Sequence, residues 1–127
     1  MNLNEIMKSL YFKKEAYFVD MFGKIKSNQT TLYSDRNNCS SRQHIEQWLL
    51  INDLLNVACF LNNGWIPNWE DSKEEKYTIV IDDGIPRPLK INQAVAFVYF
   101  PCKETVEEAI TIIGKEKLRL IFKADCS

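Results

Sequence analysis

Residues 40–67 read SSRQHIEQWLLINDLLNVACFLNNGWIP, and this stretch decides the fold. Its apolar side chains recur at helical spacing and cover an arc of roughly 200° on a helix over residues 41–63. Ser40 and Gln43 form a capping-box pattern at the start, and the run Asn-Asn-Gly at 62–64 is a typical helix stop. An apolar arc this wide needs partners on more than one side, so we expect this helix to lie at the centre of the core.

The residues before this helix fall into two parts. Residues 3–26 place apolar side chains within an arc of roughly 160°, which predicts one amphipathic helix. The alternative is a break near Lys13 and Lys14 followed by an extended segment at residues 16–19, where aromatic and β-branched side chains favour a strand. Residues 27–41 are polar, aperiodic and rich in turn formers, which predicts an exposed loop.

The residues after the central helix predict a β-β-α unit. Residues 77–81, YTIVI, are short and dense in strand-forming side chains, and the run Asp-Asp-Gly at 82–84 is a turn signal. Pro86 and Pro88 oppose regular pairing in a central strand. We therefore expect only residues 89–91 to add a short ladder segment.

Residues 94–100, AVAFVYF, predict the second clear strand, which ends at Pro101. This strand is apolar at nearly every position, so both of its faces require cover. We expect the N-terminal helix or another subunit to supply the cover for the second face.

The closing segment predicts a helix with an interruption. Thr105 and Glu108 form a capping-box pattern, although an earlier start at Cys102 is an alternative. Gly114 lies within the apolar stripe, where a glycine would cost up to about 1 kcal/mol relative to alanine. We therefore expect a kink or a second short helix at this position.

These elements predict the α+β class, with two N-terminal helices, a small antiparallel sheet of two or three strands and a C-terminal helix. The length of 127 residues suits one domain. Within it we expect a helical segment at 1–26, a polar loop at 27–41 and a helix-β-β-α core at 42–123.

Composition narrows the classes of partner and compartment. The net charge of -1 and the pI of about 5.9 argue against a dedicated double-stranded DNA binder. Neither a signal peptide nor an apolar run of roughly 20 residues is visible, which predicts a cytoplasmic protein without a membrane partner. The cysteines at 39, 59, 102 and 126 include no CxxC pair, so free thiols are expected.

The sequence contains few candidate catalytic or metal-binding residues. His44 is the single histidine, and we interpret it as a residue of the first helical turn. A zinc site would need Cys39 and His44 together with one of the remaining cysteines, and the usual short ligand spacings are missing. Asp82 and Asp83 are interpreted as turn residues. The pattern predicts no catalytic residues, no metal and no cofactor.

Trp65 and Trp69, on either side of Pro67, are the strongest binding candidates. One interpretation is that they cap the core. The other is that they form an exposed aromatic pair that anchors a partner. The same surface could stack nucleotide bases, with Arg87 and Lys90, aided by Lys73 and Lys76, contacting phosphates.

Several segments resemble a group of small proteins from gut Bacteroidetes and their phages. They are LNNGWIPNW at 61–69, VYF at 98–100, KETVEEAI at 103–110 and GKE at 114–116. The resemblance covers about residues 45–122. It implies kinship, and it implies no activity, cofactor or site residue.

The leading hypothesis is a non-enzymatic protein-interaction module, derived from a phage or mobile element, that binds a protein partner or a second copy of itself. The alternative is weak binding of single-stranded nucleic acid, which would fall with salt. A second alternative is an enzyme with an unfamiliar site, which would need a deep pocket with polar groups of strongly shifted pKa.

Overall fold

The computed structural model describes residues 1–11, 15–29 and 37–121. Within these ranges the chain forms four helices and two two-stranded antiparallel sheets, which confirms the predicted α+β class. The chain divides into two compact units, one built on Met1–Leu49 and the other on Leu50–Lys123. The boundary lies within one helix, and the single domain over residues 1–127 stays a prediction.

The first unit opens with helix α1 (Leu3–Tyr11). Asn2 caps this helix, because its Oδ1 accepts a hydrogen bond from the Glu5 N–H at 2.9 Å. The single long helix predicted for this part of the sequence is therefore correct only over its first turns. The break proposed at lysines 13 and 14 falls outside the described residues.

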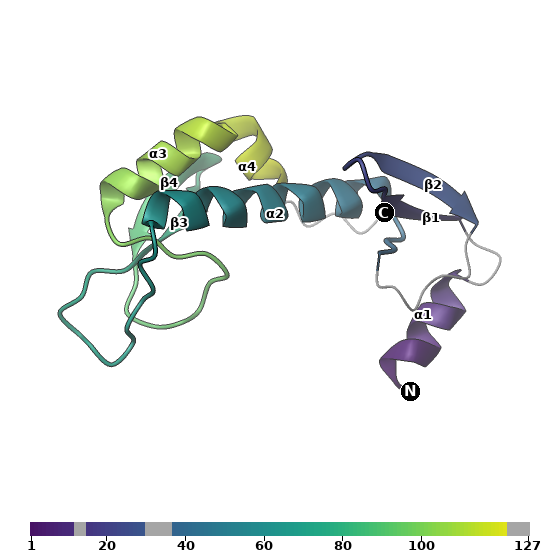
Figure 1. Ribbon diagram of the computed structural model, residues 1–127, viewed down its shortest axis with the longest axis horizontal. Coiled ribbons are helices and arrows are strands. Elements are labelled where there is room, and N and C mark those ends of the chain that lie inside the picture. Colours follow the sequence, from purple (N-terminus) through teal and green to yellow (C-terminus); the bar gives the residue numbers. More distant parts are fainter. Residues whose placement is uncertain (12–14, 30–36, 122–127) are drawn as a thin grey trace. The chain divides into compact units, whose positions relative to one another are not determined.

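A β-hairpin occupies the second half of the predicted helix (Figure 1). Strand β1 (Glu15–Val19) pairs antiparallel with β2 (Ile25–Gln29). The alternative of an extended segment at residues 16–19 is thus confirmed. Helical spacing was misleading here because the aromatic and β-branched side chains prefer a strand, and because Gly23 takes φ +76°, which a right-handed helix cannot contain.

The polar loop predicted for residues 27–41 is wrong at its beginning, but its described end, residues 37–41, is irregular apart from one bridge. Strand β2 occupies its beginning, and Cys39 pairs with Tyr17 through backbone hydrogen bonds of 2.8 and 2.9 Å. The Asn37 side chain also binds both backbone groups of Val19, at 3.0 and 2.7 Å. Polar residues here complete the edge of the hairpin. The middle of the predicted loop, residues 30–36, falls outside the described residues.

Helix α2 (Arg42–Asn62) confirms the helix that the sequence predicts most strongly. Ser41 caps it, because its Oγ accepts a hydrogen bond from the His44 N–H at 3.2 Å, one residue later than the predicted capping box. At the other end, Asn63 and Gly64 take φ values of +47° and +88°, the left-handed backbone that closes a helix.

The second unit contains a hairpin of β3 (Tyr77–Asp82) and β4 (Ile85–Lys90). The strand and the turn signal predicted for residues 77–84 are confirmed. Asp83 and Gly84 both take positive φ, as a two-residue hairpin turn that matches strand twist requires.

The two prolines of β4 do not prevent pairing, contrary to the sequence expectation. Pro86 stands opposite Ile81 and Pro88 opposite Ile79. In an antiparallel ladder, alternate residues direct their N–H groups away from the partner strand, and the prolines occupy these positions, so no ladder hydrogen bond is lost. The expectation failed because β4 is an edge strand.

The strand predicted for residues 94–100 is wrong except at its end. Phe100 bridges Tyr77 through two backbone hydrogen bonds of 2.9 Å. The Thr78 hydroxyl then donates to the Val98 carbonyl at 2.7 Å and thereby takes the acceptor that a continuing ladder would use. The Tyr99 hydroxyl bonds the backbone N–H and carbonyl of Ala96, which holds the preceding residues in a loop.

The chain closes with α3 (Lys103–Ile113) and α4 (Lys115–Ile121), separated at Gly114. The predicted interruption is confirmed, and so is the earlier start, because Cys102 occupies the N-cap and its Sγ lies 2.9 Å from Thr105 Oγ1. No helix in the described ranges combines the length and the apolarity that a membrane span requires.

The core of the second unit lies between the β3–β4 hairpin and the helices. Both α3 and α4 contact β4, and α3 also contacts β3, as Figure 1 shows. On its other side α2 exposes Leu55, Cys59 and Phe60, so the expectation of cover on more than one side is met only in part. The buried core residues are Leu54, Ala58, Ile79, Val98, Phe100, Val106, Ala109, Ile110, Leu118 and Ile121.

Candidate binding pocket beside Trp69

The loop between α2 and β3 has a defined structure built by its own polar side chains. The Asn68 N–H donates to Glu74 Oε1 at 2.8 Å, and the Lys73 N–H donates to Asp71 Oδ1 at 3.0 Å. Short polar side chains commonly organise turns in this way. Residues 63–76, between α2 and β3, therefore form a loop of defined shape, which we call the platform.

Asn62 joins the end of α2 to the second loop of this unit. Its Nδ2 donates to the Tyr99 carbonyl at 2.8 Å, although residues 62 and 99 are far apart in the sequence. The Trp65 N–H donates to the Asn62 carbonyl at 3.0 Å and completes the helix end. The two loops that flank β3 and β4 are therefore tied together at this asparagine.

Lys76 is the buried charged residue of the platform, with 3% of its surface exposed. Its ammonium donates to the carbonyls of Asp71 at 2.9 Å and Glu74 at 3.2 Å, and it lies 3.5 Å from Glu74 Oε1. A buried ammonium is tolerated only when it is paired and hydrogen-bonded. Lys76 therefore stabilises the loop through the hydrogen bonds of its buried ammonium.

Trp69 lies against this lysine and remains partly open to solvent, with 36% of its surface exposed. The Lys76 Nζ lies 5.4 Å from its ring centroid, within the range of a cation–π contact. Tyr99 meets the ring edge-on, with a centroid separation of 5.0 Å and an interplanar angle of 76°. The ring is thus fixed from two directions while part of it faces outward.

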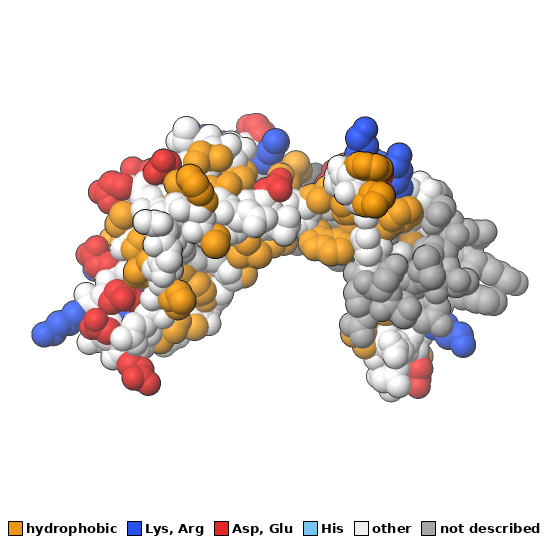
Figure 2. Space-filling model, viewed as in Figure 1, with side chains coloured by type: hydrophobic (Ala, Val, Ile, Leu, Met, Phe, Trp, Pro, Cys, Tyr) orange, Lys and Arg blue, Asp and Glu red, His pale blue; other side chains and the backbone are white. Residues whose placement is uncertain are grey.

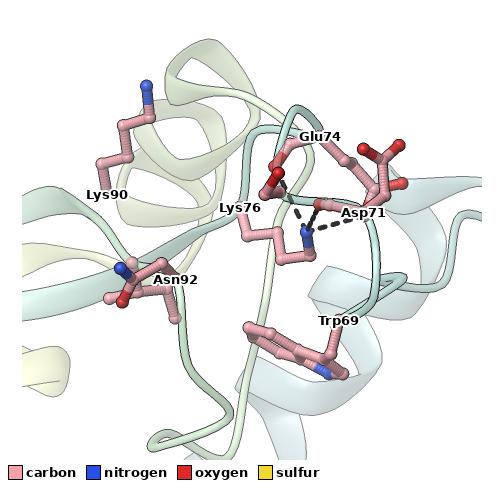
Figure 3. Close-up of a pocket in the computed structure, with 8 residues that line it drawn as sticks. Trp69, Asp71, Glu74, Lys76, Lys90 and Asn92 are labelled. Carbon is pink, nitrogen blue, oxygen red and sulfur yellow. Dashed lines mark hydrogen bonds and ion pairs between the residues drawn. The ribbon is translucent and has the colours of Figure 1, made fainter.

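A pocket of about 530 Å³ opens beside Trp69. In Figure 3 the Lys76 side chain extends over Trp69 toward the loop of Asp71 and Glu74, while Lys90 points away from both. The pocket combines one aromatic ring with charges of both signs. Its lining residues are Trp69, Asp71, Ser72, Glu74, Lys76, Lys90, Ile91 and Asn92.

A smaller pocket of about 280 Å³ lies against the β3–β4 hairpin at the pair Thr78 and Leu89, and it shares Ile91 with the pocket beside Trp69. Its lining is mostly apolar, and the loop at 95–98 forms one wall. The predicted need to cover both faces of a strand at 94–100 does not apply, because residues 95–98 form this loop. Leu89, Val95 and Phe97 remain exposed around the pocket.

The structure brings together two of the four predicted site residues. Trp69 and Lys90 line the same pocket, whereas Trp65 is partly buried at the end of α2 and is not among the lining residues. Arg87 and Lys90 project to opposite faces of β4, because side chains alternate along a strand. The nearest carboxylates are Asp82, 3.7 Å from Arg87, and Glu75, 3.5 Å from Lys90.

No sequence pattern indicated the roles of Lys76 and Tyr99. Lys76 was assigned a supporting contact to phosphate in the nucleic-acid hypothesis, and its burial opposes that role. Tyr99 was assigned to a strand, although its hydroxyl and its ring organise a loop. A tryptophan followed by a run of mixed charges was the one hint that a folded loop surrounds the ring.

The remaining chemical candidates hold structural positions. His44 lies in the first turn of α2, and Asp82 and Asp83 lie at the β3–β4 turn, as predicted. Cys39, Cys59 and Cys102 are free thiols, and burial raises the pKa of the Cys39 thiol. In the part of the chain that the structure describes, no group of three or more His, Cys, Asp or Glu side chains could hold a metal ion. Cys126 lies outside it.

Comparison with known proteins adds no functional information. No protein-family model, curated protein or solved structure matches the chain. The pocket is therefore interpreted from its own chemistry.

Proposed function

We propose that the protein is a non-enzymatic protein-interaction module and that the pocket beside Trp69 receives part of a protein partner. The observation that supports this proposal is the Trp69 ring itself, which is partly exposed yet held by Tyr99 and Lys76 beside a pocket of about 530 Å³. A fixed aromatic ring loses little conformational freedom on binding, and such residues dominate the energetics of protein interfaces.

The charges around the ring favour a polypeptide over a nucleic acid. Residues 69–76 contain four carboxylates and two lysines, and one of these lysines is the buried Lys76. Binding to a phosphate backbone needs several accessible cations on one surface. Lys90 and Arg87 lie on opposite faces, and each is near a carboxylate. A partner with both charge signs and an apolar side chain fits this pocket better.

A mobile-element origin is part of the same proposal. It is supported by the resemblance of residues 61–69 and 103–110 to proteins of gut Bacteroidetes and their phages. An interaction module without catalytic chemistry is compatible with such an origin.

Affinity capture with the tagged full chain, followed by calorimetry on the partner obtained, tests the proposal. Trp69→Ala should weaken binding by tenfold or more, because hot-spot residues contribute about 2 kcal/mol or more. Asn92→Arg should block the pocket, since Asn92 is an exposed lining residue. Gln93→Arg is the matched control, because Gln93 is its exposed neighbour and does not line the pocket.

The proposal fails if Trp69→Ala and Asn92→Arg fold correctly and retain the partner at native affinity. Binding of single-stranded oligonucleotides that falls with salt and is lost on Lys90→Glu would favour the nucleic-acid alternative instead.

A further inference from the structure

The turn that joins β1 and β2 is held rigidly by Asp20. The Asp20 carboxylate oxygen Oδ1 accepts hydrogen bonds of 2.9 Å from the N–H groups of both Phe22 and Lys24. The backbone adds two more, from Asp20 N–H to the Lys24 carbonyl at 2.8 Å and from Gly23 N–H to the Asp20 carbonyl at 3.0 Å. The carboxylate is thus engaged within the turn, and the apex between residues 20 and 24 has a fixed shape.

Two large apolar side chains project from this rigid apex. Met21 is 89% exposed and Phe22 is 80% exposed, and the four hydrogen bonds of the turn use no side-chain atom of either. The exposed lysines 24 and 26 follow directly. Figure 2 shows hydrophobic and basic side chains gathered at the turn end of the hairpin. Single exposed apolar residues are common, but an adjacent pair on an ordered convex turn calls for a binding role.

We propose that this hairpin tip, Met21 and Phe22 together with Lys24 and Lys26, docks on an anionic lipid surface. A convex apolar tip has no concavity to receive a partner, whereas the boundary between headgroups and acyl chains accepts side chains individually. The two lysines supply the charge complementarity, because each ammonium near an anionic leaflet is attracted to the lipid phosphates and carboxylates.

The spacing along the hairpin fits the layers of a bilayer interface. Apolar groups of peripheral proteins enter about 5–10 Å into the boundary between headgroups and acyl chains. Lys24 directly precedes β2 and Lys26 is its second residue, so at roughly 3.3 Å per residue Lys26 lies about 7 Å farther along the hairpin from the apex than Lys24. With Phe22 at the boundary, Lys24 lies nearer the headgroups and Lys26 farther out, and the flexible lysine stems can adjust to both levels.

The first unit exposes further apolar side chains besides those of the tip. Helix α1 exposes Leu3, Ile6 and Leu10, which share one face of the helix. The sequence predicted no membrane partner because no membrane-spanning segment is visible in it. Peripheral binding through a hairpin tip does not require a spanning segment.

Vesicle sedimentation with the full chain tests the inference. The protein is mixed with extruded vesicles of equal parts phosphatidylcholine and phosphatidylserine, or of phosphatidylcholine alone. We expect binding to the anionic vesicles that weakens with salt. Met21→Ser with Phe22→Ser should reduce the partition coefficient by tenfold or more. Each of Lys24→Glu and Lys26→Glu should reduce it by at least about fivefold.

Matched controls separate the tip from general effects. Phe60→Ser removes an aromatic side chain that is 81% exposed in the other unit, and Lys115→Glu with Lys117→Glu reverses two exposed charges of α4. These variants should bind like the native chain. The inference is overturned if the native chain does not sediment with anionic vesicles, or if the tip variants bind normally while Leu3→Ser with Ile6→Ser abolishes binding. Loss of self-association in lipid-free solution on changing the tip would assign it to a second copy and would also overturn the inference.

Discussion

The Lys76 ammonium lies 5.4 Å from the centre of the Trp69 ring and donates hydrogen bonds to the carbonyls of Asp71 and Glu74. One buried cation therefore holds both the ring and the loop that carries it. The shape of the proposed binding pocket depends on a residue that a partner would touch only in part.

Replacing Lys76 by methionine should destabilise the protein although methionine keeps the unbranched apolar stem of the side chain. The variant leaves two loop carbonyls without their donor, and hydrogen bonds to a charged group contribute about 1.5–3 kcal/mol each. We expect urea denaturation to give a free energy of unfolding lower by about 2–4 kcal/mol. Lys73→Met is the control, because Lys73 is exposed. Equal losses in the two variants would contradict the role assigned to Lys76.

The neighbouring leucines 54 and 55 offer a test of the side of α2 that faces the core. Leu54 is fully buried and Leu55 is exposed. Leu54→Ala should lower the free energy of unfolding by about 2–5 kcal/mol, since it removes transfer energy and leaves a cavity. Leu55→Ala should change it by no more than about 0.5 kcal/mol. Thermal and urea denaturation measure both, and a reversed order would show that α2 presents its other side to the core.

The hydroxyl group of Thr78 should contribute to the stability of the fold. Thr78→Val keeps the shape of the side chain but removes the donor to the buried Val98 carbonyl, which should cost about 1–3 kcal/mol. Thr111→Val is a matched control, because the Thr111 hydroxyl bonds an exposed helical carbonyl. Stability that is unchanged in Thr78→Val would mean that another group holds the loop at residues 95–98.

The β1–β2 turn should respond to acid through Asp20. The hydrogen bond from the Lys24 N–H is the main cause that lowers the pKa of the Asp20 carboxyl below its ordinary value of 3.8, and the bond from the Phe22 N–H adds to it. A carboxyl with a lowered pKa stabilises the folded turn fully above 3.8, and this contribution is lost as the pH falls through the folded-state value.

Amide chemical shifts of Phe22 and Lys24 should therefore titrate together below pH 3.8, as NMR spectroscopy can record. In Asp20→Asn the same amides should show no such transition. A shared transition near neutral pH would assign the effect to a different group.

Parts of the fold with agreeing local signals could be predicted from the sequence. Helix α2 has an apolar arc, a serine at its start and an Asn-Gly stop, and β3 has five consecutive strand formers followed by Asp-Asp-Gly. The interruption at Gly114 also followed from one residue. In these segments the hydrophobic periodicity, the intrinsic propensities and the turn residues all indicate the same structure, so tertiary contacts do not alter it.

Other segments depend on individual hydrogen bonds, which the spacing of apolar residues in the sequence does not reveal. Residues 17–25 fit a helix by spacing, yet Asp20 and Gly23 make a turn. Residues 94–100 have the composition of a strand, yet Thr78 and Tyr99 divert the chain. Trp69 and Lys90 were predicted as binding residues and line the pocket, but the pocket itself was not predicted. The burial of Lys76 was not anticipated, because a lysine that follows two glutamates has the sequence signature of a solvated loop.

The two prolines of β4 also affect how this strand can pair with a second molecule. A second molecule approaching the outer edge of this strand would meet carbonyl oxygens but, at positions 86 and 88, no amide hydrogens. The hairpin therefore cannot act as a template for fibre growth on that side, although apolar side chains lie exposed close by. Substitution of both prolines would remove this protection and leave an unguarded strand from which aggregates could grow.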